Sequence, residues 1–224
     1  MDLNISKSSK SLLLLYSISL LLICIRVYLD GSPIWFYFLL KNLLLGTLPL
    51  VFVVLARNIY HSKTPKFLRI MAVFFFSLLW LLFLPNSPYM ITDLIHLDHL
   101  PNKLLWYDAT TIFVNALTSL GMGFYATYIF QKLSNSIFSK PVSWVLIVIT
   151  HILSAFGVYL GRFLRFNSWD FFFSPGSLLA AAKHVSQDRL AFQTTFIFSL
   201  VLLALYLSFY YMLQPEQPKA FGKR

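Results

Sequence analysis

The sequence predicts an all-α protein, a polytopic transmembrane bundle with six spans and two short non-spanning helices on the outer side. Three observations support this: the composition, six long apolar runs, and the charges between them. Of 224 residues, 58% are hydrophobic and 12% are charged, with mean hydropathy +0.71. Soluble domains are about 45–50% apolar and about 25% charged. We therefore expect a single integral membrane domain covering residues 1–224.

Each apolar run is close to the length of about 20 residues that a membrane-crossing helix needs. The first run is longer than the apolar part of a signal peptide, and no small-residue cleavage site follows it, so we expect it to remain as a helix. The third run is the shortest and lies near the lower limit for spanning. The expected spans are residues 11–29, 34–56, 68–84, 109–130, 142–160 and 192–213.

The charged residues between the runs fall into two alternating groups. Basic residues near span ends mark the cytoplasmic side. We therefore expect a multi-pass protein of the cell membrane with both termini in the cytoplasm and the acidic segments outside. The basic group comprises Lys7, Lys10, Arg57, Lys63, Lys66, Arg69, Lys132, Lys140, Lys219, Lys223 and Arg224, with Asp2 and Glu216. The opposite group comprises Lys103, Arg162, Arg165, Lys183 and Arg189, with Asp30, Asp93, Asp98, Asp108, Asp170 and Asp188.

The formal net charge of +10 would suggest a nucleic acid partner in a soluble protein. Here membrane topology explains the charge, so the expected partner is the lipid bilayer and no nucleic acid is expected. The one cysteine, Cys24, lies within the first run and has no second cysteine to pair with. The sequence has no phosphate-binding loop, dinucleotide fingerprint, nucleophile elbow or zinc-protease motif, and it identifies no cofactor.

The first long outer segment, residues 84–108, predicts a short helix over 88–100. Proline suits the first position of a helix, as at Pro88, and Pro101 would end it. Such a helix is too short to span, so we expect it to lie in the interface or fold back over the bundle. Polar side chains share one face of this helix: Tyr89, Thr92, Asp93, His96 and His99.

The second long outer segment follows the fifth span. Arg162 and Arg165 are three residues apart and are expected to share a helix face, and Ser177 could begin a second short helix over 178–190. Polar stripes in spans four and five predict a cavity open to the outside, because buried polar groups in a bilayer face protein or water. The stripe of span four contains Asp108, Thr111, Asn115, Thr118, Ser119 and Met122. The stripe of span five contains His151, Ser154, Ala155, Val158, Arg162 and Arg165.

Several of these residues could take part in catalysis or ligand binding, and each could instead have a purely structural role. Asp93 and His96 are the candidate acid/base residues, and with His99 they form a weak candidate metal set, although they could simply make a wet helix face. Arg162 and Arg165 could clamp a phosphate or carboxylate, or could pair with internal acids. His151 could relay protons or could be a neutral hydrogen-bonded residue. The candidate binding residues are Tyr89, Asp108, Arg162, Arg165, Asn167 and Asp170.

Four sequence blocks resemble a bacterial membrane-protein family called domain of unknown function 1361. The resemblance covers most of the chain, and it implies a location in the bacterial inner membrane but no activity. The family pattern has tryptophan where this chain has Phe166. The blocks are Leu84-Pro85-Asn86-Ser87-Pro88-Tyr89, Thr92-Asp93-Leu94-Ile95-His96, Trp106-Tyr107-Asp108 and Gly161-Arg162-Phe163-Leu164-Arg165-Phe166-Asn167-Ser168-Trp169-Asp170.

Three functions remain open. The first is a polar site at the extracytoplasmic face that binds or acts on an anionic lipid or envelope precursor. The second is a small proton-coupled transporter, and the third is a structural or assembly subunit of a membrane complex. The sequence does not distinguish an enzyme from a carrier, and it does not give the oligomeric state. The deciding question is whether five side chains meet in one cavity: Asp93, His96, Asp108, Arg162 and Arg165.

Overall fold

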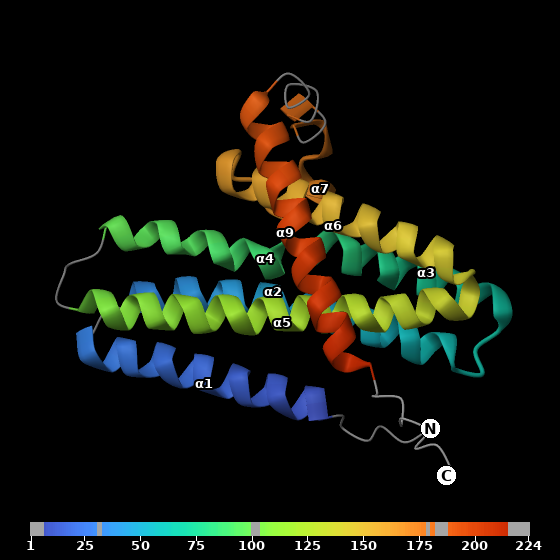
Figure 1. Cartoon of the computed structure of the whole chain (residues 1–224), viewed down its shortest axis with the longest axis horizontal. Coiled ribbons are helices and arrows are strands. Elements are labelled where there is room, and N and C mark those ends of the chain that lie inside the picture. Colours follow the sequence, from blue (N-terminus) through green and yellow to red (C-terminus); the bar gives the residue numbers. More distant parts are fainter. Residues whose placement is uncertain (1–6, 31–32, 100–103, 178–179, 182–187, 215–224) are drawn as a thin grey trace, which may run out of the picture.

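A computed structural model describes residues 7–30, 33–99, 104–177, 180–181 and 188–214. This part of the chain is helical and contains no strand, as the sequence predicts (Figure 1). The elements are α1 (Lys7–Asp30), α2 (Pro33–Tyr60), α3 (Lys66–Phe83), α4 (Asn86–Tyr89), the 3₁₀-helix η1 (Met90–His99), α5 (Leu105–Ile137), α6 (Lys140–Phe163), α7 (Asp170–Phe173) and α9 (Arg189–Leu213).

Six stretches of the described chain are long and apolar enough to cross a membrane, which confirms the prediction of six spans. The protein is therefore a multi-pass membrane protein. Five of the expected runs lie entirely within α1, α2, α5, α6 and α9, and these helices extend beyond them. The second short helix, expected over 178–190, falls mainly outside the described residues, and α9 begins at Arg189.

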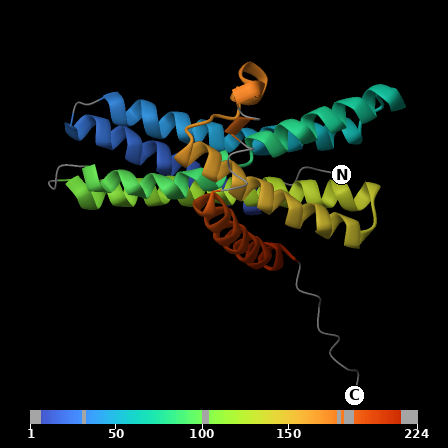
Figure 2. The same ribbon diagram turned by 90° about the horizontal axis from the view of Figure 1, so that it is seen from above.

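The 33-residue helix α5 lies at the centre of the bundle. It packs against α1, α2, α4, η1 and α6, and Figures 1 and 2 show it running along the long axis of the molecule. Its buried face is rich in small and hydroxyl-bearing residues, which allow helices to approach closely in a bilayer. By contrast, α9 packs mainly on α6 and crosses the other long helices steeply (Figure 1).

The third span is a discontinuous helix. Its α-helical part ends at Phe83, and the apolar stretch then continues through α4 and η1 as far as Leu97. Pro85 and Pro88 lack the backbone N–H that an unbroken helix would need. In Figure 1, α3 and η1 lie end to end along the bundle, with α4 between them.

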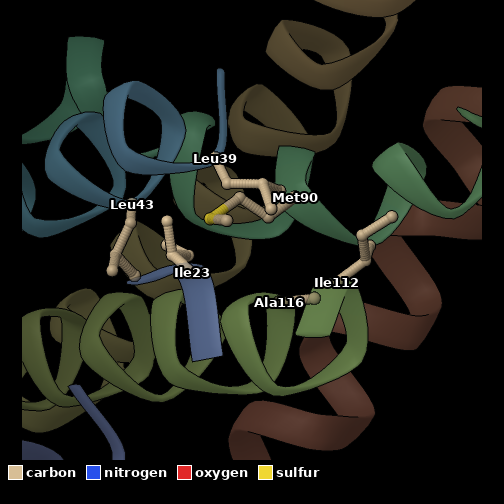
Figure 3. Close-up of a cluster of buried hydrophobic side chains, with 6 residues drawn as sticks. All are labelled: Ile23, Leu39, Leu43, Met90, Ile112 and Ala116. Atoms are coloured by element: carbon tan, nitrogen blue, oxygen red, sulfur yellow. The ribbon is translucent and has the colours of Figure 1, made fainter. Parts of the chain in front are cut away.

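This arrangement corrects the expected position of the short helix. Instead of lying in the interface or folding back over the bundle, η1 continues the third apolar stretch, runs beside α5 and touches α2 (Figure 1). The reason is that the prolines interrupt the backbone hydrogen bonds without removing the apolar side chains that pack inside the bundle. Figure 3 shows this packing, in which η1 contributes one buried side chain and α1, α2 and α5 contribute the others. The cluster contains Ile23, Leu39, Leu43, Met90, Ile112 and Ala116.

Two glycines let α4 lie deep between its neighbours. A Cβ atom on Gly123 of α5 would lie 2.6 Å from the Cβ of Ser87, and one on Gly157 of α6 would lie 2.4 Å from Cγ of Pro85. On the α2 side, the Ser87 hydroxyl donates to the carbonyl oxygen of Gly46 at 3.0 Å. The interruption in the third span is therefore held by three other helices.

Candidate functional site

The polar face of η1 points into the protein. A 3₁₀-helix has three residues per turn, so Met90, Asp93 and His96 lie in one row. Met90 and Asp93 are buried, whereas Leu94 and Ile95 on other faces are exposed. This pattern is the reverse of a surface helix in water, and it suits a segment whose outer face meets lipid.

Asp93 is held from two other helices. Nη2 of Arg162, in the last turn of α6, donates to Oδ1 at 2.5 Å, and Nδ2 of Asn42 in α2 donates to Oδ2 at 2.8 Å. The Asp93 side chain has no exposed surface. Both carboxylate oxygens are therefore used, and the negative charge is compensated by the guanidinium.

Arg162 makes three further contacts. Its Nε donates to the hydroxyl of Thr92 at 2.8 Å, its Nη1 lies 3.2 Å from Nε2 of His96, and its guanidinium carbon lies 4.5 Å from the centre of the Tyr89 ring. Because guanidinium can only donate, Nε2 of His96 must accept in this bond. The imidazole is then neutral, with its proton on Nδ1.

Arg165 does not share the helix face of Arg162, although its charge acts on the nearby Tyr89 side chain. The expectation that Arg162 and Arg165 share a helix face is wrong, because α6 ends at Phe163 and the backbone of Arg165 takes a left-handed conformation with φ of 60°. The turn is closed by the N–H of Phe166, which donates to the carbonyl of Leu160 at 3.1 Å. The Arg165 side chain is exposed.

The next residues make a turn that is anchored to the bundle. The backbone N–H of Asn167 donates to Oδ2 of Asp170 at 2.6 Å, so these two candidate binding residues bond each other. The amide of Asn86 donates to the hydroxyl of Ser168 at 2.9 Å. Nζ of Lys41 lies 5.2 Å from the centre of the Trp169 ring. The turn therefore contacts α2 and α4.

Asp108 belongs to a different ion pair. Nε of Arg26 in α1 lies 2.5 Å from its Oδ1, and Nη2 lies 3.2 Å from its Oδ2. The exposed fractions of the Arg26 and Asp108 side chains are 3% and 2%. Of the five side chains expected to meet in one cavity, Asp93, His96 and Arg162 are in mutual contact, whereas Asp108 and Arg165 lie elsewhere.

A groove of about 500 Å³ lies between η1, α6 and α9, and Arg162 forms part of its wall. The Arg162 side chain is 14% exposed. Most lining side chains are apolar, with a polar group at the Arg162 side and at the start of α9. The lining residues are Ile91, Thr92, Ile95, Val158, Arg162, Phe163, Leu190, Gln193, Thr194, Ile197 and Phe198. Gln193 and Thr194 were not predicted as site residues. They could have been recognised as two polar residues at the start of an otherwise apolar run.

The start of α9 is tied to α6. Asp188 caps α9 by accepting from the N–H of Leu190 at 2.9 Å, and it also accepts a hydrogen bond from the hydroxyl of Tyr159. The bond from Tyr159, followed by the bond from the Leu190 N–H, lowers the pKa of the Asp188 carboxyl below its ordinary value. This contact fixes one end of the groove wall.

The candidate metal ligands on η1 and His151 in α6 have different surroundings. Within the described residues, no three His, Cys, Asp or Glu side chains lie close enough to hold a metal ion, and the side chain of His99 lies outside the description. Nδ1 of His151 lies 2.8 Å from the carbonyl oxygen of Ile147, and its ring is buried beside Phe124 and Tyr206.

Comparison with known proteins gives one finding. No curated protein and no solved structure matches the chain. A family model described as "Protein of unknown function (DUF1361)" matches residues 41–212, more than half of the chain, and this range includes Asn42, Asp93 and Arg162. The chain therefore belongs to the DUF1361 family of proteins of unknown function.

Proposed function

We propose that this protein binds a membrane amphiphile with an anionic head, such as an anionic lipid or envelope precursor, in the groove between η1, α6 and α9. The observation that carries the proposal is the position of Arg162, a partly exposed guanidinium on the wall of a mainly apolar groove. In the proposed setting, a bacterial inner membrane with both termini cytoplasmic, the groove faces the extracytoplasmic side.

The guanidinium is suited to receive an anionic head. It carries five N–H groups, and the contacts with Thr92, Asp93 and His96 use one on each nitrogen. Nε2 of His96 and Oδ1 of Asp93 lie only 4.0 Å apart, so they occupy the two parallel N–H groups at the end of the guanidinium. The outer N–H of Nη1 and the outer N–H of Nη2 therefore stay available, and each can donate to an oxygen of an anionic head. The existing bonds and the Tyr89 ring hold the fork in place before a ligand arrives.

The rest of the groove suits a hydrocarbon tail. Ile95, Val158 and Ile197 come from three different helices and give it apolar walls. A volume of about 500 Å³ is within the ordinary range for small-molecule sites. In this proposal Asp93 has a positioning role, because it is fully buried behind Arg162 with both oxygens bonded.

A proton-coupled carrier is the second candidate, and the discontinuous third span favours it. Interrupted helices at a binding site are common in transporters, where the break lies between packed repeats. Here α4 and η1 provide one such interruption next to Arg162. Flux of anionic substrates into proteoliposomes, with and without a proton gradient, tests this candidate, and no flux across a broad panel would contradict it.

Native mass spectrometry of the detergent-purified protein tests the binding proposal. Arg162→Ala should lose most bound anionic lipid, at least tenfold relative to the parent protein. Arg165→Ala is the matched control, since it removes the same charge from an exposed position three residues away. Unchanged lipid adducts on folded Arg162→Ala protein would overturn the proposal.

A second pair of variants tests the groove without touching the ion pair. Thr194→Trp places a large ring in the groove from α9, whereas Phe196→Trp alters an exposed position of α9 that does not line the groove. The first change should reduce bound lipid, and the second should leave it unchanged. Equal binding by both variants would place the ligand elsewhere.

A further inference from the structure

We infer that the anion binds together with one proton, which is taken up by His96. This inference rests on the proposed function and concerns the same site. The observation behind it is that Arg162 is shared between a buried carboxylate and an imidazole that can bond the guanidinium only in its neutral form.

The first step is the charge of the site. Without ligand, Arg162 and Asp93 neutralise each other, and His96 is neutral because its Nε2 accepts from the guanidinium. A monoanion bound to the remaining N–H groups would add one negative charge inside a poorly hydrated groove. Uncompensated charge is strongly disfavoured in such surroundings, so uptake of a proton favours binding.

The second step identifies the group that takes the proton. The Asp93 side chain has no exposed surface, whereas that of His96 is 37% exposed and reachable by water. Imidazole is also the side chain that ordinarily changes charge near neutral pH. His96 is therefore the group in this cluster that can exchange protons with the medium.

The third step is the rearrangement that protonation requires. Nε2 of His96 lies 3.2 Å from Nη1 of Arg162 and 4.0 Å from Oδ1 of Asp93. A hydronium ion of the medium transfers a proton to Nε2 and becomes water, and the protonated Nε2 can then no longer accept from Arg162. The new N–H donates to Asp93 instead. Nη1 of Arg162 is released toward the groove, where it binds the anion.

The surroundings of His96 agree with this exchange. Among the described side chains, Arg162 from α6 contacts the Asp93 and His96 pair, and Tyr89 from α4 lies against Arg162. The charge of Arg165 also acts on Tyr89. From α2 come the uncharged Asn42 and the Phe38 ring, whose centre lies 5.2 Å from that of His96. From α5, Ile112 and Ala116 pack against Met90 of η1.

The experiment measures binding of a fluorescent phosphatidylglycerol to the full chain in detergent micelles, between about pH 5.5 and 8. The phosphate of this probe keeps its single negative charge over the whole range. If one proton binds with the anion, the affinity of the parent protein should fall as pH rises, approaching about tenfold per pH unit. A change much steeper than this would contradict uptake of a single proton.

Two variants separate the roles of the two side chains. His96→Gln can still accept from Arg162 but cannot be protonated, so its affinity should be low and independent of pH. Asp93→Asn removes the buried negative charge, so the anion should bind tightly without a proton, again independently of pH. His61→Gln is the control, because this exposed histidine beyond α2 should keep the parent profile.

The outcomes distinguish this inference from the proposed function. Binding by the parent protein with equal affinity at every pH would overturn proton uptake and leave the lipid site standing. A parent-like pH profile in His96→Gln would overturn the assignment to His96. No binding of the probe at any pH would overturn the lipid site as well. The pH dependence of binding by the parent protein decides whether a proton is taken up, even if one variant fails to fold.

Discussion

The two buried ion pairs use the same residue types in different ways. Arg26 places two nitrogens on the two oxygens of Asp108, and both side chains are almost completely buried. Arg162 places one nitrogen on Asp93 and directs others to Thr92 and His96, while Asn42 bonds the second oxygen. The first pair is sealed, whereas the second has 14% of its arginine side chain exposed.

The difference shows that an intramembrane arginine and aspartate do not by themselves indicate a functional site. The sealed pair joins α1 to the first turn of α5, where a carboxylate also suits the helix N-terminus. The pair of Asp93 and Arg162, which we call the open pair, joins η1 to the end of α6 beside a groove. We therefore expect a structural role for the first pair, and the second pair is the one to which the proposed lipid binding applies.

The largest expected effect is on stability at the sealed pair. Arg26→Ala should lower the free energy of unfolding by about 3–5 kcal/mol, because it leaves the buried Asp108 carboxylate without its partner. Replacing both residues, with Arg26→Met and Asp108→Leu, should recover most of this loss. Denaturant unfolding in detergent micelles measures both values, and parent-like stability of Arg26→Ala would contradict the structural role.

The next effect compares the two carboxylates directly. Asp108→Asn should cost about 1.5–3 kcal/mol, because it removes the charged acceptor of two guanidinium nitrogens of the buried Arg26. Asp93→Asn should cost less, since the Arg162 side chain has exposed surface through which solvent or an anion can compensate it. Unfolding of the two variants under identical conditions provides the test. An equal or reversed order would remove the distinction between the pairs.

A third prediction concerns the discontinuous span, which carries Asp93 of the open pair. Gly157→Ala should cost about 1–3 kcal/mol, because the new methyl group collides with Pro85. It should also weaken lipid binding, since α4 carries Tyr89 against Arg162. Gly176→Ala is the control, as a Cβ atom there meets no atom within 4 Å. Equal stability of the two variants would contradict the close packing of α4.

The smallest expected effect concerns acid stability at the start of α9. The lowered pKa of Asp188 makes its ionised form stabilising above the ordinary value of 3.8, and this contribution is lost as pH falls through the lower folded-state value. Tyr159→Phe removes the main cause, so its melting temperature should change less with pH than that of the parent protein below about pH 4. Melting curves from about pH 3 to 7 measure the melting temperatures of both proteins. Identical pH profiles would contradict a stabilising hydrogen bond between Tyr159 and Asp188.

The number and order of spans could be predicted because they depend on local composition. The site could be predicted only in part. Asp93, His96 and Arg162 were identifiable as costly polar groups near span ends, but Arg26 lies 82 residues from Asp108 and its pairing depends on tertiary packing. That Arg26 has a buried partner could have been predicted from the sequence, because an ionisable residue inside a span requires one. The position of η1 was missed because two prolines resemble the end of a span.

For the lipid binding proposed above, the shallow packing of α9 has a consequence for which part of a lipid the groove would select. Only 11% of the apolar window of α9 is buried, so one wall of the groove borders the surrounding acyl chains. A fatty tail that moves sideways from the bilayer into the groove exchanges one hydrocarbon environment for another and gains little free energy. Discrimination therefore falls on the head, and chains of different length should partition into the protein almost equally.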